Sequence, residues 1–372
     1  MKYKVLHVTQ STGGVETSLL LLLRHLDRRR FEFHLACPPR TKLAQGARDL
    51  GIPVHEVPMV RRVDPWWDCL AVARLVRLLR RERYAVLHAH SAKGGYLGRL
   101  AARLVGRPRT VYSPRAFSYL SQRGVARRFF LRLERLAVPW TDVLHATSDS
   151  EKTRAIGEVG FPAARVVVIP NSVDLAESET VRSGSPMGGG TVLTVGRLAY
   201  QKNPEMFVRV ARRILDHLPG TRFALVGAGF ASPLERQVVA LIQSLGLEGD
   251  VEILPWADRA KTLNLMMACS VFVLTSRFEG MPNTVLEAMM LRKPVVATDV
   301  DGSRDVLGTG QGGFVVPLDD DQAMADRVLA LLRDPTLAGR VGEAGRQRVL
   351  DCYDIHRNAQ MMDALYGELL GG

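Results

Sequence analysis

The sequence predicts an α/β protein built from two units, each a parallel sheet with helices on both faces. Three observations lead to this prediction. The chain has 372 residues, which is more than a single hydrophobic core usually supports. Short apolar runs rich in β-branched residues alternate with helical patterns, as in parallel sheets. A Ser- and Gly-rich stretch at residues 176–190 interrupts this alternation, which then begins again.

The expected strands follow from the apolar runs. Before the interruption they are residues 3–8, 31–36, 53–57, 85–89, 109–113, 143–147 and 166–169. After it they are residues 191–195, 223–226, 251–254, 271–274, 295–298 and 313–316. Periodic stretches such as residues 18–26, 70–81 and 96–104 are the helices between them. We expect an N-terminal domain at 1–172, a C-terminal domain at 173–353, and a last helix, about 354–372, that packs back on the first domain.

Charge is distributed unevenly between the two halves. Residues 1–172 carry 30 Lys and Arg against 13 Asp and Glu, a net charge of +17, whereas the remainder is at −5. A basic domain beside a mildly acidic one indicates that the two meet different partners. The chain begins with an expected strand rather than a signal peptide, and no apolar run approaches the roughly 18 residues of a membrane helix. Its four scattered cysteines suit reduced, buried thiols, so we expect a cytoplasmic protein.

The stretch SRFEGMPNTVLEAMM, residues 276–290, places two glutamates around the start of an expected helix. Glu279 lies in the loop after a buried strand, and Pro282 is suited to the first helical turn. The backbone N–H groups of Asn283 and Thr284 are a natural seat for phosphate. Glu287, four residues after Asn283, shares its helix face and could accept hydrogen bonds from a ribose diol. Without further context, an acidic helix start and a solvated Glu explain the pair equally well.

This stretch closely resembles the E-G-x-P-x-x-x-x-E-A signature of the family-4 glycosyltransferases, which are retaining enzymes of the GT-B fold. The resemblance extends to other segments of the chain, which are TQSTGGVET (9–17), LHAHSAKGGYLGRLAARL (87–104), TDVLHATSDSEK (141–152), VVVIPNSVD (166–174) and TVLTVGRLAYQKNP (191–204). It implies two Rossmann-like doubly wound domains facing a central cleft. The nucleoside-diphosphate sugar would bind the C-terminal domain, and the acceptor the N-terminal one.

The resemblance also implies which residues form the site. Glu279, Arg197 and Lys202 would be catalytic. The donor would be bound by Gly13, Gly14, Gly196, Arg197, Lys202, Gly280, Met281, Asn283, Thr284 and Glu287. Elementary chemistry agrees, because Arg and Lys supply positive charge for a diphosphate and the Gly13-Gly14 pair allows close backbone approach before a helix expected from Glu16. Glu16, His90 and Arg115 would face the acceptor or the cleft.

Two positions depart from the family pattern. Arg115 stands where the family commonly has a histidine near the donor sugar, so a histidine's role is not transferred to it, although an arginine could contact a phosphate. Ser172 replaces a usual glycine. His90 follows an apolar strand, where a histidine is as often structural as it is part of a cleft.

Other classes are weaker but stay open. The run LVGAGFAS (225–232) begins like a dinucleotide fingerprint but lacks its third glycine. A sugar-nucleotide epimerase would use the same architecture, and a sequence pI of about 9.9 would suit a nucleic-acid binder. We expect no nucleic-acid partner, because no recognition module is present. Residues 299–301 and 319–321 are acidic but read as a turn and a helix cap, so we expect no metal and no cofactor besides the donor.

Part of the excess of basic residues in the N-terminal half lies in the segment RGVARRFFLRLERLAVPW, residues 123–140, and indicates a function for it. It interleaves five arginines (Arg123, Arg127, Arg128, Arg132 and Arg135) with six apolar residues (Phe129, Phe130, Leu131, Leu133, Leu136 and Trp140). This composition is typical of a helix lying on an anionic membrane surface, and also of a domain helix with solvated arginines. Further arginines, Arg61, Arg62, Arg74, Arg77, Arg80 and Arg81, could extend the patch. We therefore expect peripheral docking on the inner face of the cell membrane and a lipid-linked or cell-envelope glycan as acceptor.

Overall fold

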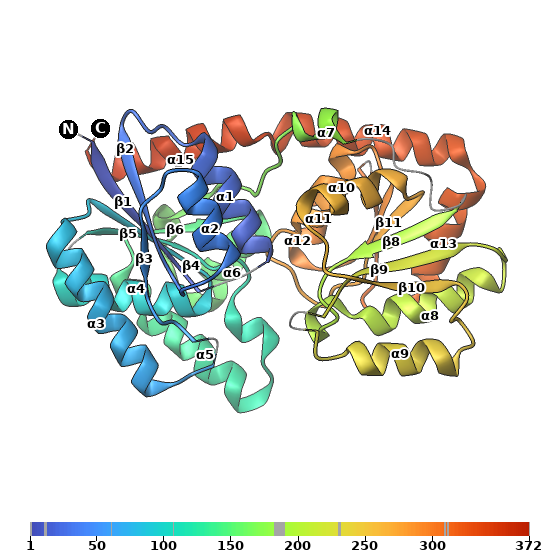
Figure 1. Cartoon of the computed structure of the whole chain (residues 1–372), viewed down its shortest axis with the longest axis horizontal. Helices are drawn as coiled ribbons and strands as arrows, with labels where there is room; N and C mark the ends of the chain where they lie inside the picture. The colour runs from blue at the N-terminus through green and yellow to red at the C-terminus, as the bar shows by residue number, and fades with distance from the viewer. Residues whose placement is uncertain are drawn as a thin grey trace. The chain divides into compact units, whose positions relative to one another are not determined.

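The computed structural model describes residues 2–10, 13–60, 62–106, 108–181, 190–229, 232–308, 310 and 312–371. The chain divides into two compact units. The first comprises Met1–Ser172 with Ile355–Gly372, and the second Val173–Asp354. Each is a parallel sheet with helices packed on both faces (Figure 1). The α/β class predicted from the alternating pattern is confirmed.

The first unit holds a seven-stranded sheet in the order β3-β2-β1-β4-β5-β6-β7. Its strands are β1 (Tyr3–Thr9), β2 (Phe31–Cys37), β3 (Val54–Glu56), β4 (Val86–His90), β5 (Arg109–Ser113), β6 (Val143–Ala146) and β7 (Val166–Val168). Its helices are α1 (Gly14–His25), α2 (Lys42–Asp49), α3 (Pro65–Glu82), α4 (Ala92–Val105), α5 (Gly124–Leu136), α6 (Asp149–Arg154) and α15 (Ile355–Leu369).

Of the three apolar cores formed by the described residues of this unit, two lie on opposite faces of the sheet. Alternate strand residues point to opposite faces, so Val5 joins the core under α1, α2 and α15, whereas Leu6 joins the core under α3 and α4. Tyr366 and Ile355 of α15 are fully buried in the first core. In Figure 1 the last helix runs along the same side of the sheet as α1. The end of the chain is therefore an integral part of the N-terminal unit.

The second unit holds a six-stranded sheet in the order β10-β9-β8-β11-β12-β13. Its strands are β8 (Thr191–Val195), β9 (Arg222–Ala228), β10 (Val251–Pro255), β11 (Val271–Leu274), β12 (Val295–Thr298) and β13 (Phe314–Val316). Its helices are α7 (Glu177–Thr180), α8 (Pro204–Leu215), α9 (Glu235–Ser244), α10 (Arg259–Ala268), α11 (Asn283–Met290), α12 (Asp301–Leu307), α13 (Asp321–Arg333) and α14 (Pro335–Cys352). One core lies under α8, α9 and α13, and the other under α10, α11 and α14.

Several local expectations need correction. The stretch 176–190 is not loop throughout, because its start forms the short helix α7; residues 182–189 lie outside the described part. Helix α1 begins at Gly14, two residues before the expected start at Glu16, because Gly13 with φ of 77° already provides the turn. Pro282 precedes α11 as its N-cap and is not in the first turn. Of the four free cysteines, Cys69 is exposed rather than buried.

Candidate active site

The loops that follow β8 and β11 lie side by side, because these two parallel strands are neighbours and both loops leave the same edge of the sheet. Hydrogen bonds join the loops directly. The Thr275 hydroxyl donates to the carbonyls of Lys202 at 2.8 Å and Asn203 at 3.0 Å. The backbone N–H of Arg277 donates to the carbonyl of Gln201 at 2.7 Å. The second unit thereby holds its expected cationic loop against its expected acidic one.

Glu279 is the central side chain of this junction. Lys202 Nζ lies 2.6 Å from Glu279 Oε1, and the Ser276 hydroxyl donates to the same oxygen at 2.6 Å. Gln201 Nε2 approaches the other carboxylate oxygen at 3.4 Å. The Glu279 side chain is only 8% exposed. Because a buried carboxylate is stable only with such partners, its position and orientation are fixed.

Glycines let the backbones around this junction touch. A Cβ atom at Gly302, at the start of α12, would lie 2.2 Å from the carbonyl oxygen of Gly280. At Gly227, where φ is +131°, a Cβ would lie 2.4 Å from the carbonyl oxygen of Gly196. No side chain fits either position, since real Cβ atoms do not approach so closely. The backbone at Gly196 is therefore pressed against β9, and the backbone at Gly280 against the start of α12.

Helix α11 begins just after Gly280. Its first residues, Asn283 and Thr284, are half-buried, and the amide groups in a first helical turn have no carbonyl within the helix to bond. The Thr284 hydroxyl is buried and has no hydrogen-bond partner among the described residues. Met281 differs, because its side chain packs into the apolar core. A ligand at this helix start would thus meet backbone amides, two short polar side chains and only the backbone of Met281.

Glu287, one turn further along α11, is held by Arg259. Arg259 Nη1 lies 2.6 Å from Glu287 Oε1, and its Nε lies 2.9 Å from both carboxylate oxygens of Glu177 on α7. Burial raises the pKa of Glu287 while Arg259 opposes the rise. Burial alone would lower the pKa of Arg259, but its two carboxylate partners raise it. Arg259 therefore stays charged and keeps a buried carboxylate at a fixed position.

Arg197 completes the set in this unit. It follows Gly196 directly, is half-buried, and lies on the loop that carries Lys202. Arg197, Lys202, Glu279, the α11 start and Glu287 thus all lie along the carboxyl ends of β8 and β11. Such cations and amides can receive a diphosphate, and the carboxylates can accept hydrogen bonds from sugar hydroxyls.

The remaining expected residues belong to the first unit. Gly13 caps α1, and the carbonyl of Gly13 accepts the N–H of Thr17 at 3.0 Å. Gly14 is exposed, and Glu16 is half-buried with its pKa raised by burial. These three lie beyond the carboxyl end of β1. They therefore occupy the ligand-facing edge of the N-terminal sheet.

His90 and Arg115 lie at that same edge, in different settings. His90 is fully buried and its Nε2 lies 3.0 Å from His7 Nδ1, so it does not line a surface. Arg115 is half-buried on the loop after β5 and bonds to the Asn171 side chain.

Sequence reasoning missed several side chains that shape both sites. Arg259 and Glu177 come from helices far from the Glu279 motif in the sequence, and an Arg at a helix start gives no distinctive signal. Ser276 was part of the quoted stretch, and its spacing of three from Glu279 could have indicated a partner. In the first unit, His7, His88 and His145 recur within expected strands, which was a usable signal for a shared face.

Two family models match the chain. The model described as glycosyl transferases group 1 matches residues 177–348. The model described as glycosyltransferase family 4 matches residues 12–177. Together they span residues 12–348, with one model for each unit.

Curated relatives are similar along most of the chain. UDP-Gal:alpha-D-GlcNAc-diphosphoundecaprenol alpha-1,3-galactosyltransferase of Escherichia coli is 27% identical over 99% of this chain and 98% of its own. The putative glycosyltransferase EpsD of Bacillus subtilis (strain 168) is 26% identical over 90% of this chain and 88% of its own.

Solved structures share the architecture. The Anabaena protein HepE, in complex with UDP and glucose, matches with a TM-score of 0.83 and 21% identity, over 98% of this chain and 100% of that one. A glycosyltransferase from Rickettsia africae matches with a TM-score of 0.82 and 16% identity, over 100% and 99%. With both family models and this fold in agreement, the chain belongs to the group 1, family-4 glycosyltransferases of the GT-B fold.

Proposed function

We propose that this glycosyltransferase moves a hexosyl or N-acetylhexosaminyl group from a nucleoside-diphosphate sugar to a lipid-linked or cell-envelope glycan, with retention of the anomeric configuration. The observation that carries the proposal is the pair of buried carboxylates, Glu279 and Glu287, each held by one cation beside a helix start. The UDP complex of the structural relative HepE and the diphosphoundecaprenol-linked acceptor named for the E. coli relative support it.

Each group has a role in this proposal. Arg197, Lys202 and the amides of Asn283 and Thr284 would neutralise the diphosphate as it leaves. Glu287 would accept hydrogen bonds from the ribose diol. Glu279 would hold hydroxyls of the transferred sugar, and its bond to Lys202 would place sugar and phosphate at a set distance from each other. We infer retention of the anomeric configuration from the resemblance to the family-4 glycosyltransferases.

The proposed acceptor agrees with the surface of helix α5. Val125, Arg128, Phe129, Arg132 and Leu136 recur at helical spacing and are all exposed, with Phe129 at 53% and Leu136 at 61%. Arg128 and Arg132 form no ion pair with any described residue. This exposed stripe of arginines and large apolar side chains is suited to an anionic membrane surface.

The opposite face of α5 belongs to the domain. Glu134 is buried and pairs with the fully buried Arg99 at 2.9 Å, while the Tyr112 hydroxyl donates to it at 2.8 Å. Phe130 and Leu131 pack against the apolar core. Of the six apolar residues of this segment, only Phe129 and Leu136 are exposed.

A second exposed apolar group lies at the start of α3. Val63 and Trp66 are 69% and 78% exposed, and Trp67 is also exposed. Arg74, Arg77, Arg80 and Arg81 line the outer side of the same helix; Arg61 lies outside the described residues. Tryptophan is enriched where protein meets the membrane interface, so this group supports docking of the N-terminal unit. No helix in the described part of the chain is long and apolar enough to span a membrane.

Glu279→Gln and Glu287→Gln should each lower turnover by about tenfold or more. The first removes the charge that orients hydroxyls of the transferred sugar, and the second removes the charge that orients the ribose diol. Steady-state sugar transfer measures this, with circular dichroism to check folding. Glu248→Gln, at an exposed position of the same unit, is the matched control. Unchanged kinetics in both variants would rule out the assignment.

Transfer should persist in EDTA, because arginine, lysine and helix amides supply the positive charge that a metal provides in other transferases. The measurement is the initial rate with and without EDTA, followed by added Mg²⁺ or Mn²⁺. Loss of activity that either ion restores would contradict metal independence.

The protein should sediment with anionic liposomes but not with neutral ones, and the binding should weaken as salt rises. Arg128→Gln/Arg132→Gln should reduce it by about 30-fold, since each arginine near such a surface contributes about 1 kcal/mol. Arg340→Gln, exposed in the second unit, serves as the control. Equal, negligible binding to both liposome types would favour a soluble acceptor.

A further inference from the structure

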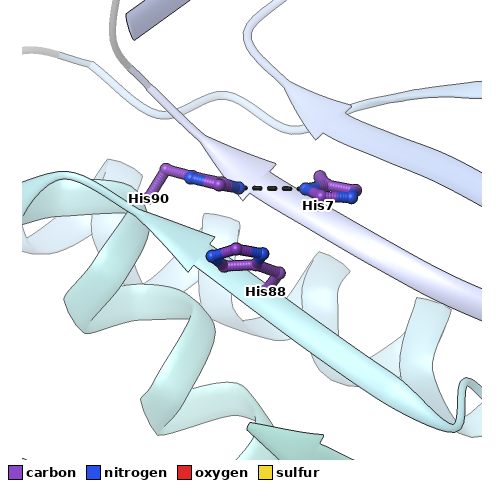
Figure 2. Close-up of side chains that lie close together, drawn as sticks. All are labelled: His7, His88 and His90. Atoms are coloured by element: carbon purple, nitrogen blue, oxygen red, sulfur yellow. Dashed lines mark hydrogen bonds between the residues drawn. The ribbon is translucent and has the colours of Figure 1, made fainter. Parts of the chain in front are cut away.

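A row of polar side chains crosses the sheet of the first unit beneath α15. Strand periodicity places His7 of β1, His88 and His90 of β4, Ser113 of β5 and His145 of β6 on one face. All five are buried. Figure 2 shows His7 and His90 joined end to end, with His88 beneath them. The ring centroids of His88 and His90 are 4.1 Å apart.

Part of this row is a hydrogen-bond chain with a fixed direction. His145 Nε2 lies 2.8 Å from the carbonyl of Ile169, which can only accept, so this nitrogen carries the proton. His145 Nδ1 then accepts from the Ser113 hydroxyl at 2.7 Å, and Ser113 accepts from His88 Nε2 at 2.7 Å. His88 Nδ1 accepts in turn from the Tyr366 hydroxyl at 2.7 Å. The chain therefore fixes His88 and His145 as neutral tautomers.

The other two imidazoles are neutral as well. Burial, followed by the charge of Arg115, lowers the pKa of His7 to about 3. Burial and neighbouring charges, including that of Arg115, also hold the pKa of His90 well below its usual range. His7 Nε2 and His90 Nδ1 are buried without a partner among the described residues. No member of the row carries a charge at neutral pH that could offset a nearby cation.

Arg115 is that cation, and its charge is only partly offset by Glu151. Burial lowers its pKa only to about 10, so it is protonated at neutral pH. Its Nη1 donates to the neutral Asn171 side chain, and its Nε is buried without a partner. Among the described residues, no carboxylate lies within ion-pair distance of it. The charge of Glu151 raises the pKa of Arg115, but Glu151 forms no ion pair with it, and its oxygens accept bonds from Ala116 and Thr147.

The backbone at Arg115 is strained. Arg115 and Ala116 both have positive φ, 58° and 77°, although neither is glycine. Two consecutive residues of this kind persist only where surrounding bonds impose them, and such strain concentrates at functional sites. Here the Ala116 N–H is fixed by Glu151 at 2.8 Å.

A metal ion is not the occupant that this arrangement favours. His7, His88 and His90 offer nitrogens within 4.8 Å of one another. Both nitrogens of His88, however, are engaged with Ser113 and Tyr366. A metal would also sit near the guanidinium of Arg115, which has no ion-pair partner among the described residues. An unpaired arginine among neutral imidazoles attracts an anion instead.

We propose that Arg115 binds a phosphate or diphosphate group of a substrate at the carboxyl edge of the N-terminal sheet. A guanidinium matches phosphate oxygens in a two-pronged geometry, and the uncharged row behind it leaves its charge unscreened. The proposal rests on the proposed function, in which the acceptor is lipid-linked, and assigns Arg115 to the acceptor's diphosphate.

The test uses the histidine rings as reporters in the full-length protein. Imidazole NMR signals are followed while inorganic pyrophosphate is added at constant ionic strength. His7, His88, His90 and His145 should shift saturably, whereas His217 of the second unit should not. Arg115→Gln should weaken the apparent affinity at least about tenfold, and Arg115→Lys less so. Arg340→Gln, exposed in the second unit, should leave the response unchanged.

Two results would overturn the proposal: no saturable shift in the parent protein, or an equal response in Arg115→Gln. Thermal unfolding of Arg115→Gln is a second readout, because removal of a buried charge without an ion-pair partner should not lower Tm, whereas loss of a structural residue should. Two further titrations compare UDP with a short-chain polyprenyl diphosphate. A response to the prenyl compound alone supports the acceptor as the source, and a response to UDP alone transfers the site to the donor and overturns that assignment. None of these measurements requires turnover, so they separate this proposal from that of glycosyl transfer.

Discussion

The ligand-facing edge of the C-terminal unit depends on the pairing of two buried carboxylates with one cation each. Glu279 would be unstable in its loop without Lys202 at 2.6 Å, and Glu287 would be unstable on α11 without Arg259 at 2.6 Å. Removing one partner of such a pair typically destabilises a protein by about 3–5 kcal/mol, because the other charge stays buried. The pairs therefore fix the positions of four charged groups. Without its cation, each buried carboxylate would be protonated or mobile.

The two ion pairs differ in the further contacts of their cations. Lys202 is on the loop next to Glu279, so a bound phosphate would share the lysine with the carboxylate. Arg259 is anchored from its other side by Glu177 of α7. Helix α7 lies where the chain enters the second unit, so the position of Glu287 is tied to that entry segment.

The N-terminal unit differs from the C-terminal unit in how its charged and neutral polar groups are distributed. Its surface carries many arginines, whereas its buried polar groups include a row of neutral imidazoles beside the ion pair of Arg99 and Glu134. The hydrogen-bond chain from Tyr366 to Ile169 keeps two of those rings uncharged, and α15 supplies the first donor. One cation, Arg115, is placed beside this row without a carboxylate partner. The charge of Arg115 is thus not engaged in an ion pair with any described carboxylate.

The sequence was sufficient for the strands and the order of the elements, because apolar runs and their period depend on local burial. It also located the Glu279 and Glu287 motif, since loop and helix start are contiguous. It could not pair Arg259 with Glu287, because that contact joins α10 to α11 through the packing of the unit. It could not divide α5 into an exposed stripe and an inward face, since composition does not show which face the Arg99–Glu134 pair anchors.

Nucleotide binding tests the central role of the buried ion pairs most directly. Thermal unfolding is measured with UDP, GDP, TDP and ADP on the parent protein, on Arg259→Met and on the Glu248→Gln control. A ligand specific to the native state raises Tm with its concentration, and at about 100 times its Kd it contributes about 2.7 kcal/mol. We predict that at least one of the four raises Tm in the parent and control, and that Arg259→Met loses most of that increment relative to its own ligand-free Tm. An increment undiminished in Arg259→Met, or none with any nucleotide, would contradict the account.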